Sequence, residues 1–96
     1  MREQINEKRA ARVEGNRAKI VKYLQEHPCI DCGEKDIIVL EFDHRHGMEK
    51  VGDVAKMVFS YSWERILLEI EKCDVRCANC HRRRTASSRG YFKTLY

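Results

Sequence analysis

The 96-residue sequence has no long apolar run, and its longest clean stretch, Ile-Ile-Val-Leu at residues 37–40, has only four residues. A membrane-spanning helix needs roughly 20 consecutive apolar residues, so we expect no membrane partner. The N-terminus also lacks the basic start, apolar run and small-residue cleavage site of a secretory signal. Five cysteines are an odd number, which disfavours a disulfide framework. We therefore expect a soluble protein of a reducing compartment, the cytoplasm.

Acidic residues are missing from the end of the chain, because no Asp or Glu follows His81. The complete sequence has 19 basic and 15 acidic residues and a formal net charge of +4, and residues 2–26 are also basic on balance. Two basic ends favour a polyanionic partner such as nucleic acid, although basic runs also occur as plain solvated surfaces. The basic residues after His81 are Arg82, Arg83, Arg84, Arg89 and Lys93.

Helix-forming residues dominate residues 2–26, and Pro28 lies just beyond them. We expect one long helix, or two helices joined at Gly15 and Asn16. Apolar residues gather in the second half, so this half should pack on the body while the first half is loose. We favour a solvated surface helix over a DNA-gripping arm. The apolar positions at helical spacing are Val13, Ile20 and Leu24.

Two short segments predict strands. Residues 37–42 are β-branched and apolar, and they lie between a Gly-Glu-Lys-Asp turn and Asp43, which favours a buried strand. Residues 74–76 predict a brief second strand. Asp43 and His44 would then lie at the end of the first strand, in a single domain of the α+β class.

Three further helices are expected. The positions of Val54, Met57 and Val58 suit one face of a short helix. Ser62 is the predicted N-cap of a helix over residues 63–72, whose apolar stripe faces the core while its acidic residues face solvent. A last helix is expected over residues 78–85. The stripe consists of Trp63, Ile66, Leu67 and Ile70, and the acidic residues are Glu64, Glu69 and Glu71.

Two Cys-x-x-Cys turns, Cys29 with Cys32 and Cys77 with Cys80, are a strong metal signal. A two-residue gap lets both thiolates of a turn reach one ion, and four thiolates form the tetrahedral set that zinc prefers. We expect a structural Zn²⁺ ion, which would help to stabilise the modest core of a chain this short. Four ordinary core cysteines are the alternative. Cys73 is expected to be buried as a small apolar residue.

Asp43, His44 and His81 are the candidates for chemistry. His81 directly follows Cys80, so zinc binding would hold it near the body of the fold, where it can meet the Asp-His pair. A carboxylate and an imidazole suit one divalent cation, while a second, free imidazole can act as a base near neutral pH. This arrangement is typical of a hydrolase, although a His at a strand end is also often purely structural.

Three segments together resemble the zinc-containing HNH endonucleases, the His-Me finger nucleases of the ββα-metal fold. They are Cys-x-x-Cys at residues 29–32, Leu-Glu-Phe-Asp-His at 40–44 and Cys-Ala-Asn-Cys-His-Arg at 77–82. The resemblance spans residues 29–85 and implies a small ββα-metal core with extra helices between the two cysteine turns. It divides the chain into a basic N-terminal helix (1–27), an HNH zinc domain (28–86) and a basic C-terminal tail (87–96).

The resemblance also implies metal-dependent hydrolysis of DNA, by nicking or cutting with low sequence specificity, as in nucleases of phages and mobile elements. His44 takes the position of the general base. Asp43 and His81 take the positions that hold Mg²⁺ or another divalent cation such as Mn²⁺ or Ni²⁺. The products would carry a 5′-phosphate and a 3′-hydroxyl. Phosphate contacts are expected from Arg82, Arg83 and Arg84, and more weakly from Arg45.

The middle Asn of the family motif has no counterpart before Cys77, where the sequence reads Glu-Lys-Cys-Asp-Val-Arg. A backbone carbonyl of the second strand could orient the His44 ring instead, because the ring needs only an acceptor for one N-H. Two other functions stay open, a non-catalytic zinc-stabilised module that binds DNA or RNA and a zinc-stabilised protein-interaction domain. The oligomeric state is not specified by the sequence.

Overall fold

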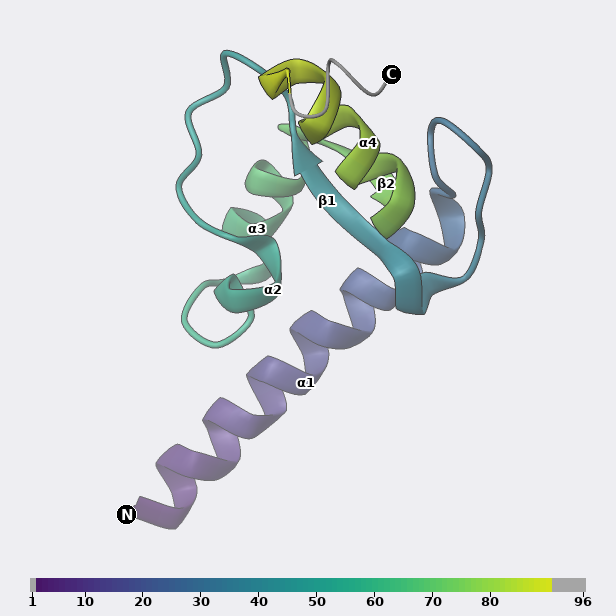
Figure 1. Cartoon of the computed structure of the whole chain (residues 1–96). Helices are drawn as coiled ribbons and strands as arrows, with labels where there is room; N and C mark the ends of the chain where they lie inside the picture. Colours follow the sequence, from purple (N-terminus) through teal and green to yellow (C-terminus); the bar gives the residue numbers. More distant parts are fainter. Residues whose placement is uncertain (1, 91–96) are drawn as a thin grey trace.

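The computed structural model describes residues 2–90, with side chains from residue 7 onward. Within this range the chain forms four α-helices and a two-stranded antiparallel sheet, so the predicted α+β class is confirmed. Figure 1 shows a body built around the two strands, from which the long N-terminal helix extends. Part of the expected C-terminal tail, residues 91–96 with Lys93, lies outside the described residues.

Helix α1 (Arg2–Glu26) is continuous, so the alternative of a break at Gly15 and Asn16 is wrong. Asn16 is 3% exposed, and its side-chain amide donates hydrogen bonds to the carbonyl oxygens of Val58 (3.1 Å) and Tyr61 (3.0 Å). These bonds fasten the middle of α1 to the body. Val13, Ile20 and Leu24 of α1 pack on the body, as predicted, and Tyr23 packs there as well.

Strands β1 (Leu40–His44) and β2 (Cys73–Cys77) pair antiparallel, in a register that sets Asp43 opposite Asp74. Successive side chains of a strand point to opposite faces of the sheet, so the neighbours Asp43 and His44 belong to different faces. One face of β1 carries Leu40, Phe42 and His44, and the other carries Glu41 and Asp43.

The strand predicted for residues 37–42 is wrong at its start, because Ile37–Val39 form a 3-10 turn, η1. The Asp36 side chain accepts a hydrogen bond from the backbone N-H of Ile38 (3.0 Å), which stabilises this turn. Ile38 is 87% exposed, whereas the prediction placed it in a buried strand. β1 therefore begins three residues later and includes both Asp43 and His44.

Helices α2 (Val54–Met57) and α3 (Trp63–Ile70) lie between the two strands in the sequence. Ser62 caps α3 as predicted, because its hydroxyl oxygen accepts a hydrogen bond from the N-H of Arg65 (3.4 Å). The prediction that Glu69 faces solvent is wrong, since Glu69 is 2% exposed and its carboxylate turns toward polar partners. The core beside these helices contains Val54, Met57, Val58, Ile66, Ile70 and Cys73, the last buried as expected.

Helix α4 (Ala78–Arg89) packs against both strands and continues beyond the predicted end at residue 85. Its N-terminus is capped by the sulfur of Cys77, which accepts a hydrogen bond from the N-H of Cys80 (3.5 Å). The helix ends at Gly90, whose φ of +71° is left-handed and therefore suits glycine. None of the helices within residues 2–90 is both long and apolar enough to cross a membrane.

Candidate active site and metal centre

The cysteines of the two Cys-x-x-Cys turns come together beside the start of α4. Their Sγ atoms all lie within 4.8 Å of one another, and those of Cys32 and Cys77 are 3.7 Å apart. A zinc ion with four Zn–S bonds of about 2.3 Å has S–S edges of about 3.8 Å. The cluster could therefore hold a metal such as zinc, and its cysteines are free rather than paired in disulfides. The four members are Cys29, Cys32, Cys77 and Cys80.

Backbone hydrogen bonds hold the first cysteine turn against β2. The N-H of Ile30 donates to the carbonyl oxygen of Val75, and the N-H of Gly33 donates to that of Cys29, both at 2.9 Å. Gly33 has a φ of +80°, which the tight turn requires and glycine adopts readily. Burial opposes ionisation of Cys29, but hydrogen bonds from neighbouring backbone groups lower its pKa to about 6. Cys29 thus favours the thiolate form that binds metals. In Cys32 of the same turn a backbone hydrogen bond acts in the same direction, but hydrogen bonds with the sulfurs of Cys29 and Cys77 raise the pKa.

His81, in the first turn of α4, lies between two carboxylates of β1. Its Nδ1 donates a hydrogen bond to Oε1 of Glu41 (2.8 Å), and its Nε2 lies 3.4 Å from Oδ1 of Asp43. Both acids reach α4 because alternate residues of a strand share one face. While Nδ1 of His81 bonds to Glu41, Nε2 is the ring nitrogen that faces Asp43. A carboxylate behind one ring nitrogen is the usual support of a metal-binding His.

Asp43 is buried and is held by two guanidinium groups. One nitrogen of Arg84 in α4 donates to both carboxylate oxygens at 2.8 Å, and Arg76 of β2 donates to Oδ2 at 2.9 Å. Arg76 also binds Asp31 (2.8 Å) and Asp74 (3.4 Å). Although burial opposes it, hydrogen bonds to the acidic residues raise the pKa of Arg76. The two arginines thus balance the charge of a buried carboxylate.

His44 contacts a different carboxylate on the opposite face of β1. Its Nε2 lies 2.7 Å from Oε2 of Glu69, which belongs to α3. The Glu69 carboxylate also accepts hydrogen bonds from Nζ of Lys72 (2.9 Å) and from the backbone N-H of Val51 (3.1 Å). Burial opposes ionisation of Glu69, but its hydrogen bonds to Lys72, His44 and Val51 lower its pKa. The expected partner of His44 was a backbone carbonyl of the second strand, and the structure provides this carboxylate instead.

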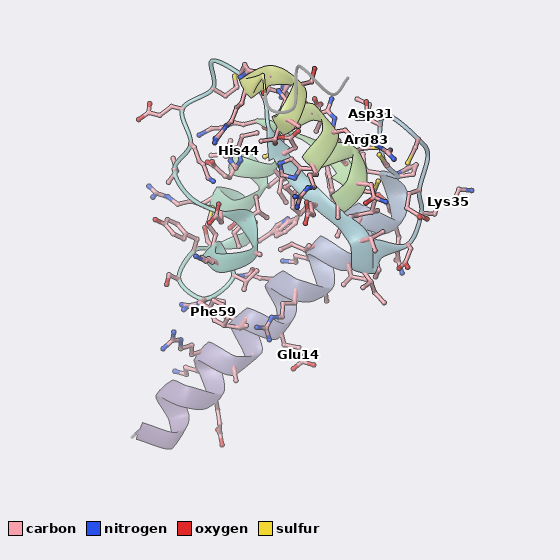
Figure 2. All side chains as sticks on the ribbon, in the orientation of Figure 1. Glu14, Asp31, Lys35, His44, Phe59 and Arg83 are labelled. Atoms are coloured by element: carbon pink, nitrogen blue, oxygen red, sulfur yellow. The ribbon has the colours of Figure 1, made fainter. Side chains whose placement is uncertain are left out.

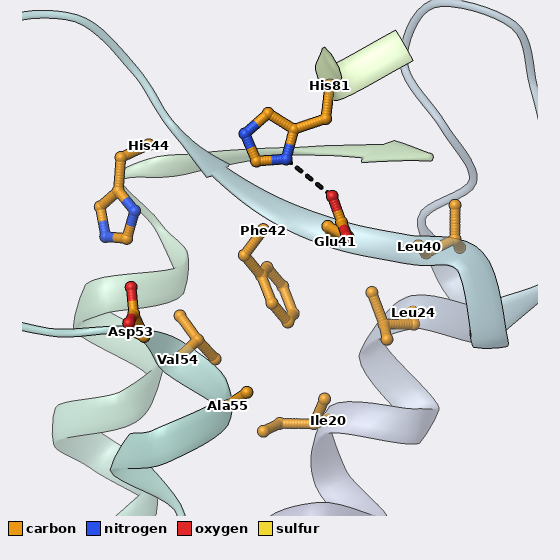
Figure 3. Close-up of a pocket in the computed structure, with 10 residues that line it drawn as sticks. All are labelled: Ile20, Leu24, Leu40, Glu41, Phe42, His44, Asp53, Val54, Ala55 and His81. Carbon is orange, nitrogen blue, oxygen red and sulfur yellow. Dashed lines mark hydrogen bonds and ion pairs between the residues drawn. The ribbon is translucent and has the colours of Figure 1, made fainter. Parts of the chain in front are cut away.

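A pocket of about 360 Å³ runs along the edge of β1 that β2 leaves unpaired, as Figure 3 shows. His44 and His81 both line it, together with Phe42. Because Asp43 and His44 point to opposite faces of β1, a single group can approach both only around this open edge. The apolar lining is formed by Ile20, Leu24, Leu40, Phe42, Val54 and Ala55, and the polar lining by Glu41, His44, Asp53 and His81.

The arginines expected to bind phosphate fall into two groups. Arg82 and Arg83 are exposed on α4, and Figure 2 shows Arg83 on the body, well separated from Glu14 on α1. The other two are engaged within the fold. Arg84 binds Asp43, as described above, and Arg45 donates to the carbonyl oxygen of Cys73 (3.1 Å) and to Asp74 (3.2 Å).

Glu41, Glu69 and Arg76 are the members of this site that sequence reasoning missed. Strand alternation could have identified Glu41, because a residue two positions from Asp43 shares its face. Arg76 lies opposite Glu41, which becomes visible only when the register of the strands is known. Glu69 was assigned to the solvent side because it is acidic, although it follows the buried Ile66 by three residues and therefore borders the packed face of α3.

No protein-family model matches the chain, and neither the curated proteins nor the solved structures provide a significant match. Any function must therefore be argued from the residues and their geometry.

Proposed function

We propose that the protein is a metal-dependent endonuclease of the HNH type that hydrolyses phosphodiester bonds of DNA. The observation that carries this proposal is that His81 of α4 lies against Asp43 of β1 and lines one pocket with His44. The cysteine cluster lies at the start of α4, and its member Cys80 directly precedes His81. The cluster therefore holds His81 beside β1. The order β1, β2, α4, with α4 packed on the strands, also supports a ββα-metal core.

The pair formed by Asp43 and His81 fits a divalent cation. Oδ1 of Asp43 and Nε2 of His81 lie 3.4 Å apart. Adjacent ligands of an octahedral cation with bonds of about 2.1 Å are about 3.0 Å apart, so a small closure would bring both into range. One oxygen and one nitrogen ligand suit Mg²⁺, Mn²⁺ or Ni²⁺. The cation would stabilise the negative charge on the phosphate and on the departing 3′ oxygen.

His44 is the proposed general base, because its ring lines the same pocket as His81. A water in the pocket would give one proton to His44 while its oxygen bonds to phosphorus. The bond from phosphorus to the 3′ oxygen breaks, and this oxygen takes a proton from solvent. The exposed side chains of Arg82 and Arg83 would bind phosphates on either side of the cut.

Cleavage of supercoiled plasmid DNA tests the proposal. Wild-type protein should convert the plasmid to nicked or linear form with Mg²⁺, Mn²⁺ or Ni²⁺, and His44→Ala should lose about 10²- to 10⁴-fold in rate. His46→Ala is the matched control, since His46 is two residues away and exposed. Cleavage that persists in His44→Ala but not in His46→Ala would refute the assignment of the base.

A non-catalytic, zinc-stabilised module that binds nucleic acid is the second candidate, and the state of Asp43 favours it. Its carboxylate is already neutralised by Arg76 and Arg84, as in a structural ion-pair network. Such a module would bind DNA with an affinity that falls as salt rises, yet would cleave it with none of the three cations. The endonuclease should do both. A protein-interaction domain should show neither property.

A further inference from the structure

We infer that Glu69 is the positioning residue of the proposed base: it holds the His44 ring with the proton on Nε2 and leaves Nδ1 to receive the proton of the attacking water. The role in cleavage rests on the proposed function, whereas the position of the ring proton does not. Glu69 would thereby serve the purpose that the missing middle Asn serves in the family motif.

The surroundings of Glu69 hold its carboxylate in one position as a hydrogen-bond acceptor. Its side chain is 2% exposed, and three donors from three segments converge on its two oxygens. Lys72 binds Oε1, while His44 and the N-H of Val51 bind Oε2. A buried carboxylate with three donors has one orientation, so the His44 ring that it binds is restrained as well. Val51 also fixes the loop that follows β1 to the same carboxylate.

The chemistry of a carboxylate determines which ring nitrogen carries the proton. An ionised carboxylate can only accept hydrogen bonds, and the lowered pKa of Glu69 keeps it ionised at neutral pH. Nε2 of His44, 2.7 Å away, must therefore be the donor. In the neutral ring the lone pair then lies on Nδ1.

The direction of the ring supports the same assignment. His44 lines the pocket and Glu69 does not, so Nε2 faces α3 while the rest of the ring borders the open edge of β1. Figure 3 shows the His44 ring with one nitrogen turned toward Phe42 and the pocket and the other turned away. The nitrogen turned toward the pocket is the one that can meet a water beside a bound phosphate.

The first experiment determines the tautomer of His44 directly and does not depend on DNA cleavage. Long-range ¹⁵N–¹H NMR spectra of histidine-labelled wild-type protein at alkaline pH, with the His44 signals assigned from His44→Ala, should show the proton on Nε2. In Glu69→Gln, which keeps the size of the side chain, this preference should weaken to a mixture of both tautomers. Glu64→Gln changes an exposed acid of the same helix and should leave the spectrum of His44 unchanged.

The second experiment asks whether Glu69 acts through His44. Glu69→Gln should lower kcat about 10- to 100-fold, the usual cost of losing such a support, with KM within twofold of wild type. The same substitution in a His44→Ala background should cause no further loss, because the group that it positions is gone. This absence of additivity would not follow from a purely structural role.

Three results would overturn the inference. The first is a wild-type His44 that carries its proton on Nδ1. The second is a Glu69→Gln protein whose melting temperature falls while the His44 tautomer is unchanged. The third is an equal loss of rate on adding Glu69→Gln to wild type and to His44→Ala. A wild-type protein that does not cleave DNA would refute the proposed function instead, and the NMR result would still decide the position of the proton.

Discussion

Removal of metal from the cysteine cluster should destabilise the whole body of the protein. The sequence separates Cys32 from Cys77 by 44 residues, and this interval contains β1, α2, α3 and most of β2. A cross-link across a loop of this length lowers the entropy of the unfolded chain, which stabilises the fold by about 4 kcal/mol at 25 °C. Small domains have total stabilities of only about 5–15 kcal/mol, so the loss would be a large share.

Cys32→Ala is the cleanest substitution for this test. Cys32 is the exposed member of the cluster, so its removal leaves core packing intact, whereas Cys77 also caps α4. We expect purified wild type to contain one zinc per chain, and Cys32→Ala to release zinc at a much lower chelator concentration. A loss of about 4 kcal/mol corresponds to a melting temperature lower by roughly 15–30 °C for a domain of this size.

Circular dichroism melts with and without chelator, together with metal analysis, would provide the measurement. Cys73→Ala is the matched control, because Cys73 is buried but does not belong to the cluster. It should cost about 1 kcal/mol of packing and keep one zinc per chain. The reasoning would be refuted if wild type lacked zinc, or if chelator left its melting temperature unchanged.

Three further predictions concern single side chains. Asn16→Ala should lower the free energy of unfolding by about 2 kcal/mol in urea titrations, because a buried and a partly buried carbonyl oxygen lose their donor, while the exposed Asn79→Ala should change it little. The lowered pKa of Glu69 means that its stabilising effect is complete above its unfolded pKa of about 4.3 and disappears as pH falls through the lower folded value. The difference in free energy of unfolding between wild type and Glu69→Gln should therefore be constant above about pH 5 and become smaller at lower pH, as measured by urea titrations. A difference that stayed constant down to about pH 3 would contradict this prediction. Arg83→Ala should reduce the slope of log affinity for DNA against log salt by about 1, whereas Lys35→Ala, a change of the same charge just after the first cysteine turn, should leave the slope unchanged.

Features that depend on neighbours in the chain were predictable from the sequence. The Ser62 cap, the packing face of α1 and the membership of the cysteine cluster all follow from spacings of a few residues, and the structure agrees with each. The first strand shows the limit of such reasoning. Residues 37–39 have a strand-like composition, yet the Asp36 side chain bonds the backbone locally and turns them into η1. A short polar side chain outweighed β propensity there.

The partners of Glu69 depended on tertiary structure alone. An acidic residue is normally assigned to the solvent side, because burying a charge without partners is costly. The cost is removed here by Lys72, Val51 and His44, which reach Glu69 from separate parts of the chain. The spacing of Glu69 from Ile66 places it beside the packed face of α3, but no pattern within this helix identifies the partners of its carboxylate.

The sequence by itself determined which residue types the cysteine cluster and the proposed catalytic site contain, since the cysteine turns and the Asp-His pair are local. The tertiary structure decided how they are arranged. It placed Asp43 between Arg76, Arg84 and His81 on one face of β1, and His44 against Glu69 on the other. The physical reason is that strand register and helix packing bring together charges distant in sequence, and the energy of a buried charge depends on these partners.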